Sequence, residues 1–407
     1  MSNKMWARVK LSDIGSVVGG ATPSTSVEKY YGGEIAWVTP KDLSSFSGRY
    51  IECGERNITE EGLNSCSAQL LPAGSVLFSS RAPIGYVAIA KNPIATNQGF
   101  KSLVPDTKKV DSLFMYYLLK YNKNRIEAMG SGTTFKEVSG ATMKNIEVNL
   151  PPLAEQKRIA GILGALDDKI ELNRRINANL EEQAQALFKS WFVDFEPFRD
   201  GPFIDSELGK IPKGWKVGTI NEIIQILSGF AFKSGTFSED GPYQLITIKN
   251  VQDGNLNVNG AVHISEIPDR MPLHCKLYIG DILLSLTGNV GRVSIVDQDS
   301  LLLNQRVAKL RPKDKRNTFF TYTLFRQDNF KQYLIQIAKG TAQLNLSPIE
   351  IGETKIILPN HDLLSQFGEI GQPLFDRIVS NSREIITLST LCDTLLPKLM
   401  AGEIAIE

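Results

Sequence analysis

Two segments, LDDKIELNRRINANLEEQAQALFKSWF (166–192) and LFDRIVSNSREIITLSTLCDTLLPKLM (374–400), determine the architecture that this sequence predicts. In both segments one row of residues recurs at alternating steps of three and four, which is the spacing of a coiled-coil seam. The first row contains Leu166, Ile170, Asn173, Asn177, Leu180, Ala184, Leu187 and Trp191. The second row contains Leu374, Ile378, Asn381, Ile385, Leu388, Cys392, Leu395 and Leu399, and Pro397 interrupts it near its end. Each segment is predicted to form a long helix, and the two mostly apolar seams can cover each other.

The similarity of the two helices belongs to a duplication of the whole chain. WVTPKDL (37–43) corresponds to LITIKNV (245–251), and LPAGSVLFSSRAPIGYVAI (71–89) corresponds to LYIGDILLSLTGNVGRVSI (277–295). An internal repeat of this kind fixes the order of domains before any local assignment is made. Each half therefore contains a globular block, a Leu-Pro pair and a long helix, in that order.

Each globular block is predicted to have mixed α and β structure. Short β-branched runs separated by glycine and proline predict strands at SVLFSS (75–80), GYVAIA (85–90), DILLSLTG (281–288) and RVSIV (292–296). Apolar spacing predicts helices at 111–129 and 318–338, and the Pro- and Gly-rich stretch 195–215 is predicted to be a linker. The predicted divisions are a first block (1–150), a first helical spacer and linker (151–200), a second block (201–358) and a second helical spacer (359–407).

The two helices are expected to pair antiparallel, which would place the blocks at opposite ends of a rod related by an approximate two-fold axis. About 25 residues at roughly 1.5 Å each give a spacer of about 37 Å. One turn of B-DNA is roughly 34–36 Å long, so two blocks on such a spacer could reach successive major grooves. The alternative is that the helices are only a brace between two domains. Asn173 and Asn381 occupy equivalent seam positions, where they either fix the register of the pair or tilt toward solvent.

Charge alternates along the chain, although its formal net charge is only +1. Residues 1–150 hold 17 Lys and Arg against 13 Asp and Glu, and residues 201–358 hold 18 against 15. The helical segments are acidic, with 7 against 9 in residues 151–200 and 3 against 7 in residues 359–407. The small net charge argues against a protein that coats nucleic acid indiscriminately, but it leaves two positive blocks.

The sequence contains no pattern of a metal centre or of a catalytic site. Its four cysteines form no CxxC pair and its three histidines are scattered, and the neighbours His274 and Cys275 are expected to be bystanders. Gly209 and Lys210 precede Ile211, so they do not form a phosphate-binding loop. LPPL (150–153) lacks the amide and the aromatic ring with which adenine methyltransferases hold a flipped base. We therefore expect no catalytic residue, no metal and no cofactor in this chain.

The sequence also predicts no membrane segment. It contains no run of roughly 18 apolar residues, and its first residues lack the apolar run of a signal peptide. We expect a cytoplasmic protein with no membrane partner.

A resemblance to a known family lies in the segment between the blocks. LPPLAEQKRIAGILGALDDKIELNRRINANLEEQAQALFKSWFVDFEPF (150–198) closely resembles the central conserved region of type I restriction–modification specificity subunits. LGKIPKGW (208–215), GSGTT (130–134) and LLPKLMAGEI (395–404) extend that resemblance over the chain. The second copy departs from the pattern, because LPNHDLLSQ (358–366) stands where the first has LPPLAEQ, so the two partner surfaces need not be equal.

That resemblance implies a definite architecture and function. It implies two α/β target recognition domains joined by two long antiparallel coiled-coil helices, which recognise a bipartite, asymmetric sequence in double-stranded DNA. Two methyltransferase subunits would dock on the conserved helical regions, and restriction/translocase subunits would join them. The specificity subunit of such a complex has no active site of its own, and its helices set the number of unread base pairs.

Candidate DNA contacts are polar residues in turns or strand ends near the glycine-containing motifs of the repeat, where loops can reach a groove. Arg, Lys, Asn and Gln supply the donors and acceptors that match guanine and adenine edges. In the first block the candidates are Lys41, Arg49, Arg81, Asn97, Gln98, Lys101, Thr133 and Lys136. In the second block they are Lys249, Asn250, Thr287, Arg292, Asn304, Gln305, Arg306, Lys309, Thr341 and Gln343.

Candidate contacts to the methyltransferase lie on helix faces away from the seam and at the end of the first helix. They are Glu155, Gln156, Lys157, Arg158, Glu181, Glu182, Phe188, Trp191 and Phe192. For the three aromatic residues, packing inside the helix pair is the equal alternative. For the chain as a whole, the alternative to a DNA-specificity subunit is a coiled-coil adaptor that bridges two protein partners without binding DNA.

Overall fold

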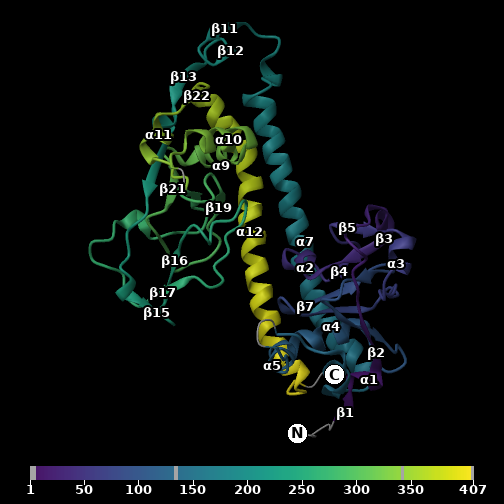
Figure 1. The fold of residues 1–407 in the computed structure, drawn as a ribbon. Helices are drawn as coiled ribbons and strands as arrows, with labels where there is room; N and C mark the ends of the chain where they lie inside the picture. The colour runs from purple at the N-terminus through teal and green to yellow at the C-terminus, as the bar shows by residue number, and fades with distance from the viewer. Residues whose placement is uncertain (1–5, 133–135, 341–342, 405–407) are drawn as a thin grey trace. The chain divides into compact units, whose positions relative to one another are not determined.

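The structure is a computed structural model that describes residues 6–132, 136–340 and 343–404. Its contacts divide the chain into two compact units, Met1–Glu171 with Leu388–Glu407, and Leu172–Thr387. Two helices of 40 residues, α7 (Leu153–Phe192) and α12 (His361–Met400), each contribute one part to the first unit and the other part to the second (Figure 1). At about 1.5 Å per residue each helix is about 60 Å long. No helix in the described ranges is long and apolar enough to cross a membrane.

The first unit contains a five-stranded sheet and a three-stranded sheet (Figure 1). The larger sheet has the order β2 (Gly15–Gly19), β9 (Lys101–Pro105), β6 (Val76–Ser80), β7 (Ile84–Ala90) and β4 (Tyr50–Ile51), and only the β4–β7 pair is parallel. The smaller sheet has the order β5 (Arg56–Ile58), β3 (Tyr31–Val38) and β8 (Ala95–Thr96), and β1 (Ala7–Lys10) pairs with β10 (Glu147–Leu150). The helices are α1 (Leu11–Ile14), α2 (Pro40–Ser44), α3 (Glu60–Asn64), α4 (Ser112–Tyr121), α5 (Lys123–Ala128) and α6 (Gly140–Asn145). The strands predicted at 75–80 and 85–90 are therefore confirmed, and the helix predicted at 111–129 is divided at Asn122.

Both faces of the central strand β6 are buried, which explains its unbroken run of apolar and small residues. Val76 and Phe78 on one face pack in a cluster with α4, and Leu77 on the other face packs in a second cluster. The long helices complete the first cluster, since Leu163 of α7 and Leu399 of α12 belong to it. The first unit is thus built on the beginning of α7 and the end of α12.

The second unit contains two four-stranded sheets (Figure 1). One has the order β14 (Ile224–Ser228), β21 (Val307–Pro312), β18 (Ile282–Ser285) and β19 (Val293–Ile295). The other has the order β15 (Phe237–Ser238), β17 (Val262–Ile264), β16 (Tyr243–Ile246) and β20 (Leu301–Leu303). β13 (Lys216–Thr219) pairs with β22 (Lys355–Leu358), and the helices are α8 (Ile220–Ile223), α9 (Thr318–Arg326), α10 (Asp328–Ile337) and α11 (Pro348–Glu353). The predicted strands β18 and β19 are confirmed, and the helix predicted at 318–338 is again two helices.

An aromatic cluster fixes the end of α7 in the core of the second unit. The ring of Phe192 lies 4.7 Å from that of Phe367 on α12 and 5.0 Å from that of Phe320 on α9, measured between centroids. Trp215 lies 5.7 Å from Phe192 and 5.1 Å from Phe198. The stretch 195–215, predicted to be a linker, therefore begins and ends in this core. Its middle part forms a hairpin of β11 (Phe203–Ser206) and β12 (Gly209–Pro212). The prediction of a linker did not include this hairpin.

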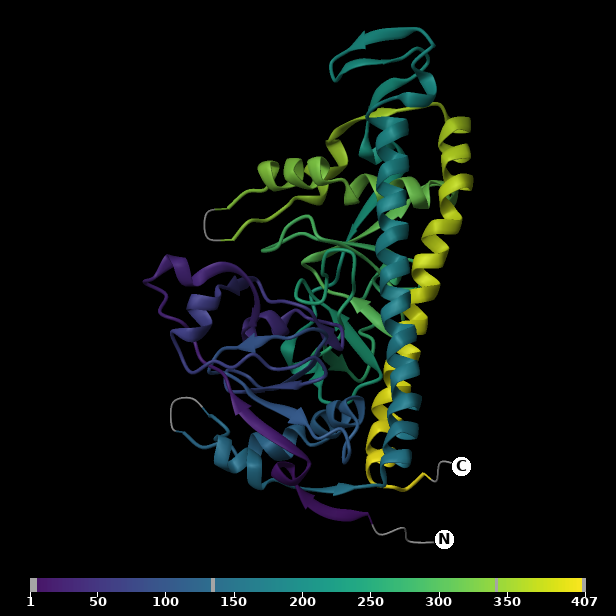
Figure 2. The same cartoon turned by 90° about the vertical axis from the view of Figure 1, so that its right-hand side faces the viewer.

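Within the second unit, α7 and α12 lie side by side (Figure 2). Hydrogen bonds of asparagine side chains join them. Asn173 donates to Glu384 Oε2 at 2.8 Å, Asn177 donates to the Ile378 carbonyl at 3.2 Å, and Asn381 donates to Asn177 Oδ1 at 2.9 Å. Partner numbers fall along α12 as they rise along α7, so these segments run in opposite directions. Asn173 and Asn381 are 0% and 1% exposed, which excludes the solvent-facing alternative for both.

Pro397, near the end of the second seam, does not end the helix α12. The helix continues through it to Met400, and the Pro397 carbonyl accepts a hydrogen bond from Ala401 N at 2.9 Å. A proline removes only one donor from the ladder, and side-chain packing of the last turn against the first unit holds the helix in place, since Leu399 and Met400 are 2% and 3% exposed.

Candidate nucleic-acid interface

In the first unit, two of the predicted DNA contacts converge on one carboxylate. Arg81 Nη1 lies 3.8 Å and Lys101 Nζ lies 3.1 Å from the Glu137 carboxylate, and Arg81 and Glu137 also form an isolated β-bridge. The three side chains are 35%, 17% and 38% exposed, respectively. Sequence reasoning brought Arg81 and Lys101 to one region but missed Glu137, because nothing in the spacing of these residues shows that they meet.

The other first-unit candidates lie on or near the surface, and several already have local partners. Lys41 at the start of α2 forms an exposed ion pair of 2.7 Å with Glu55. Asn97 is half-buried and its Oδ1 accepts from Gly99 N at 2.9 Å, as expected of a residue that holds a turn. Gln98 and Lys136 are exposed, and Gln98 accepts a hydrogen bond from Thr22. Thr133 lies outside the described residues.

Arg49 has a structural position that its sequence context does not show. Its side chain is 4% exposed and contacts three acidic side chains of α7, with Asp168 and Glu171 as hydrogen-bond acceptors and Asp167 at 4.0 Å. Burial alone would lower the pKa of the guanidinium, but Tyr117 and these carboxylates outweigh it and raise that pKa. Arg49 therefore ties β4 to the long helix, and as placed it presents almost no surface to DNA.

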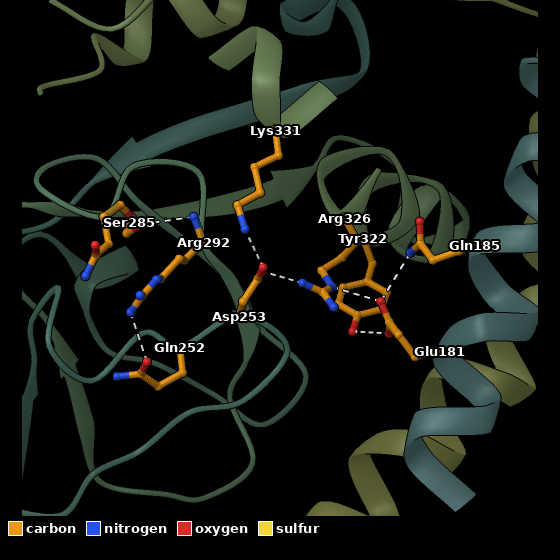
Figure 3. Close-up of polar contacts among 10 residues, drawn as sticks. Glu181, Gln185, Gln252, Asp253, Ser285, Arg292, Tyr322, Arg326 and Lys331 are labelled. Atoms are coloured by element: carbon orange, nitrogen blue, oxygen red, sulfur yellow. Dashed lines mark hydrogen bonds and ion pairs between the residues drawn. The ribbon is translucent and has the colours of Figure 1, made fainter. Parts of the chain in front are cut away.

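In the second unit, Arg292 is the predicted contact with the most defined surroundings. It is half-buried, and its Nη1 donates to Gln252 Oε1 at 2.9 Å (Figure 3). Lys249, Gln305, Arg306 and Gln343 are exposed, and Asn304 is half-buried. Thr341 lies outside the described residues.

Three further candidates of the second unit are buried by local structure. Asn250 caps a turn, since its Oδ1 accepts from Thr247 N at 2.9 Å and its Nδ2 donates to the Asn257 carbonyl at 2.9 Å. Thr287 donates to Asn345 Oδ1 at 2.8 Å, and Lys309 pairs with Asp281 at 2.6 Å. The exposed fractions of Asn250, Thr287 and Lys309 are 4%, 5% and 8%. These three residues therefore stabilise the block from within. The sequence pattern alone does not distinguish this structural role from contact with DNA.

A charged network connects α7 to the loop that carries Gln252 (Figure 3). Glu181 on α7 accepts from Arg326 Nε at 2.8 Å and from the Tyr322 hydroxyl at 2.5 Å. Arg326 also donates to Asp253, which accepts a second hydrogen bond from Lys331 Nζ at 2.5 Å. Burial raises the pKa of Asp253, but the Lys331 hydrogen bond and the charge of Arg326 outweigh it, and the net shift is downward. The carboxylate is therefore ionised, and the loop is tied to the helix through alternating charges.

The predicted partner contacts on α7 divide into buried and exposed groups. Gln156 is 0% exposed and bridges loops, since it accepts from Asp111 N at 3.0 Å and donates to the Lys109 carbonyl at 3.0 Å. Glu155, Phe188 and Phe192 are 8%, 4% and 7% exposed, Trp191 is half-buried beside Phe367, and Glu181 belongs to the network above. Lys157, Arg158 and Glu182 are exposed. Phe188 and Phe192 thus belong to the core of the second unit, and Trp191 packs against that core.

Comparison with known proteins identifies the family. The profile described as "Type I restriction modification DNA specificity domain" matches residues 3–182 and again residues 212–372. The chain belongs to this family. It is 38% identical to the type I restriction enzyme MjaIX specificity subunit of Methanocaldococcus jannaschii, over 99% of this chain and 94% of that protein. It is 26% identical to the HindI specificity subunit of Haemophilus influenzae, over 88% of this chain and 92% of that protein.

A solved structure shares the fold of this type I specificity protein. The S subunit of a type I restriction–modification system from M. genitalium matches with a TM-score of 0.57 at 19% identity, covering 98% of this chain and 97% of that one. As a member of the family, the chain is a DNA sequence-specificity subunit and is not itself catalytic. In the described part of the chain, no group of three or more His, Cys, Asp or Glu side chains could hold a metal ion.

Proposed function

We propose that each block reads one half of a bipartite, asymmetric site in double-stranded DNA. The main support for this proposal is that the DNA-specificity domain of one family matches the chain twice, once over each half. The side chains available on the two halves differ, since Arg81 and Lys101 of the first block correspond in the repeat to Thr287 and Ala308 of the second. Different donors and acceptors select different base edges, so the two halves of the site are expected to differ in sequence.

We propose that the two long helices act as the spacer between the blocks. In this proposal 1–150 and 201–358 are the target recognition domains, and 151–200 and 359–407 are the helical spacers, paired as an antiparallel coiled coil with approximate two-fold symmetry. The part-buried hydrogen bond between Asn177 and Asn381 supports it, because a polar pair in an apolar seam favours one register over its neighbours. The length of the spacer then sets the number of base pairs left unread.

The residues that we retain as DNA contacts are those with exposed or half-buried side chains on the loops of each block. They are Lys41, Arg81, Asn97, Gln98, Lys101, Lys136, Lys249, Arg292, Asn304, Gln305, Arg306 and Gln343. Arg49, Asn250, Thr287 and Lys309 are assigned to the scaffold because they are buried and paired. Phosphate contacts by the lysines would position the duplex, and base contacts by the Arg, Asn and Gln side chains would select the sequence.

We propose that two methyltransferase subunits and the restriction/translocase subunits are the protein partners. The exposed α7 residues Lys157, Arg158 and Glu182 are the contacts to the methyltransferase that the structure leaves accessible. A protein that directs such enzymes acts where the cell's DNA is, so the cytoplasm is the proposed location. No cofactor is proposed for this chain.

The test is to co-produce the chain with the methyltransferase subunit of its own system and to map methylated adenines in genomic DNA. Methylation at one split motif, with a fixed gap, is the expected result. The competing hypothesis, a protein adaptor that does not bind DNA, predicts no motif and no salt dependence of duplex binding. A DNA-binding protein loses affinity as salt rises because phosphate contacts release counterions.

A further inference from the structure

One serine holds the same turn in both blocks. In the first, Ser79 Oγ donates to the Pro83 carbonyl at 2.8 Å and accepts from Tyr86 N at 2.8 Å. In the second, Ser285 Oγ donates to the Asn289 carbonyl and accepts from Arg292 N at 3.0 Å. Both serines are fully buried. The backbone at positions 86 and 292 is therefore fixed by the same hydrogen bonds, while the side chains attached to it differ.

The two blocks have different side chains at this clamped position, and also at the position that contacts it in the second block. Where the second block has Arg292 and Gln252, the first has Tyr86 and Ser44. Arg292 Nη1 donates to Gln252 Oε1 at 2.9 Å (Figure 3). Gln252 Nε2 donates to the Lys249 carbonyl at 2.8 Å. Both ends of the Gln252 amide are thus engaged. The Arg292 guanidinium therefore donates to a fixed acceptor, Gln252 Oε1, through only one of its three nitrogens.

Arg292 also differs from the cations of the first block in its electrostatic surroundings. Arg81 and Lys101 share the carboxylate of Glu137, whereas no carboxylate in the described ranges lies within ion-pair distance of Arg292. Its one side-chain partner in those ranges is the neutral amide of Gln252. A neutral acceptor orients the guanidinium without cancelling its charge, so the remaining donors are available to a ligand that carries acceptors.

Two sets of hydrogen bonds fix the loop that carries Gln252. Gly254 N donates to the Val293 carbonyl at 2.7 Å, which joins the loop to the first residue of β19, directly after Arg292. Asp253 joins it to Arg326 and Lys331, and Arg326 reaches Glu181 on α7. Gly254 has φ +82, and an added Cβ would lie 3.2 Å from Arg326 Nη2, so a side chain there would be strained and would press on the guanidinium.

We propose that Arg292, oriented by Gln252, reads a guanine in the half-site of the second block. This inference rests on the proposed function, since it assigns one base to one of the two half-sites. A guanidinium with two donors in one plane matches the O6 and N7 acceptors of guanine in the major groove. Gln252 and Asp253 are positioning residues: Gln252 fixes the plane of the guanidinium, and Asp253 fixes the loop that carries Gln252. The first block, with Tyr86 at the same clamped position, does not make this contact.

The experiment selects bound duplexes from a library of random double-stranded DNA with the full chain in complex with its methyltransferase, and compares the motifs of variants. Arg292→Lys keeps the charge but loses the planar fork, so it should reduce the preference for guanine at one position of one half-site by roughly 5- to 150-fold, which corresponds to about 1–3 kcal/mol. Gln252→Ala and Asp253→Asn should weaken the preference at that same base pair. Gln298→Ala is the matched control, because Gln298 is a half-buried glutamine of the same block whose amide bonds Gln244 and not Arg292.

The outcomes separate the inference from the function on which it rests. If the unaltered protein selects a split motif and Arg292→Lys leaves both half-sites unchanged, or alters a base other than guanine, the assignment of Arg292 is overturned while the proposed function stands. If the unaltered protein selects no motif, both fall. A merely structural role for Gln252 and Asp253 predicts a lower melting temperature and weaker binding to every sequence. The positioning role predicts a changed base preference in a protein that melts normally and keeps its salt dependence.

Discussion

Replacing Arg49 with methionine separates a structural arginine from a DNA-binding one. The change keeps most of the apolar stem and removes the guanidinium, which is 4% exposed and bonds Asp168 and Glu171 of α7. Removing one partner of a wholly buried ion pair costs about 3–5 kcal/mol. Here the carboxylates of Asp168 and Glu171 are 71% and 30% exposed, so water solvates them after the change and about half of that cost, roughly 2 kcal/mol, is expected.

Thermal unfolding followed by circular dichroism measures this loss. For a unit of this size, a loss of about 2 kcal/mol lowers the melting temperature by roughly 4–8 °C. DNA binding measured at a temperature where the variant is folded should keep the original preference at both half-sites and the original dependence on salt. An unchanged melting temperature, together with a salt slope lowered by about one, would refute the reasoning, because that pair of results marks a phosphate contact.

Three further predictions concern other parts of the chain. Asp297 is 7% exposed and burial raises its pKa from 3.8 to about 6, so the folded state loses stability as the pH rises from about 4 through 6. Asp297→Asn should raise the free energy of unfolding by roughly 2–3 kcal/mol at pH 7 and leave it unchanged at pH 3. Equal gains in melting temperature at both pH values would contradict this. Phe192→Ala should destabilise the second unit by about 3–5 kcal/mol, whereas loss of methyltransferase binding in a normally melting variant would show a partner contact instead. Arg81→Ala should relax recognition of the first half-site alone, and unchanged motifs in library selection would remove Arg81 from the interface.

The candidate site was only partly predictable from the sequence. Arg81 and Lys101 could be placed near each other because they flank the repeated glycine motifs, but Glu137, whose carboxylate forms ion pairs with both, could not. Lys309 and Asn250 have the residue types of DNA contacts, yet the structure buries them beneath the loops. A Lys or Arg side chain that faces a DNA groove and one that pairs with a carboxylate inside the protein have the same residue type and local spacing. Only the fold distinguishes the two.

The sequence by itself determined the duplication, the two long helices and the α/β character of both blocks, because these depend on periodic apolar spacing and on similarity between segments of one chain. It also carried the resemblance through which the family was expected. The tertiary structure alone decided that Arg49 and Glu181 link loops to α7, that Phe192 lies in a core, and that Gln252 orients Arg292. These contacts join residues that are far apart in the chain: Gln252 and Arg292 are separated by 40 positions, Arg49 and Asp168 by 119, and Glu181 and Arg326 by 145. Side-chain partners at such separations are selected by packing in three dimensions, which leaves no periodic trace in the sequence.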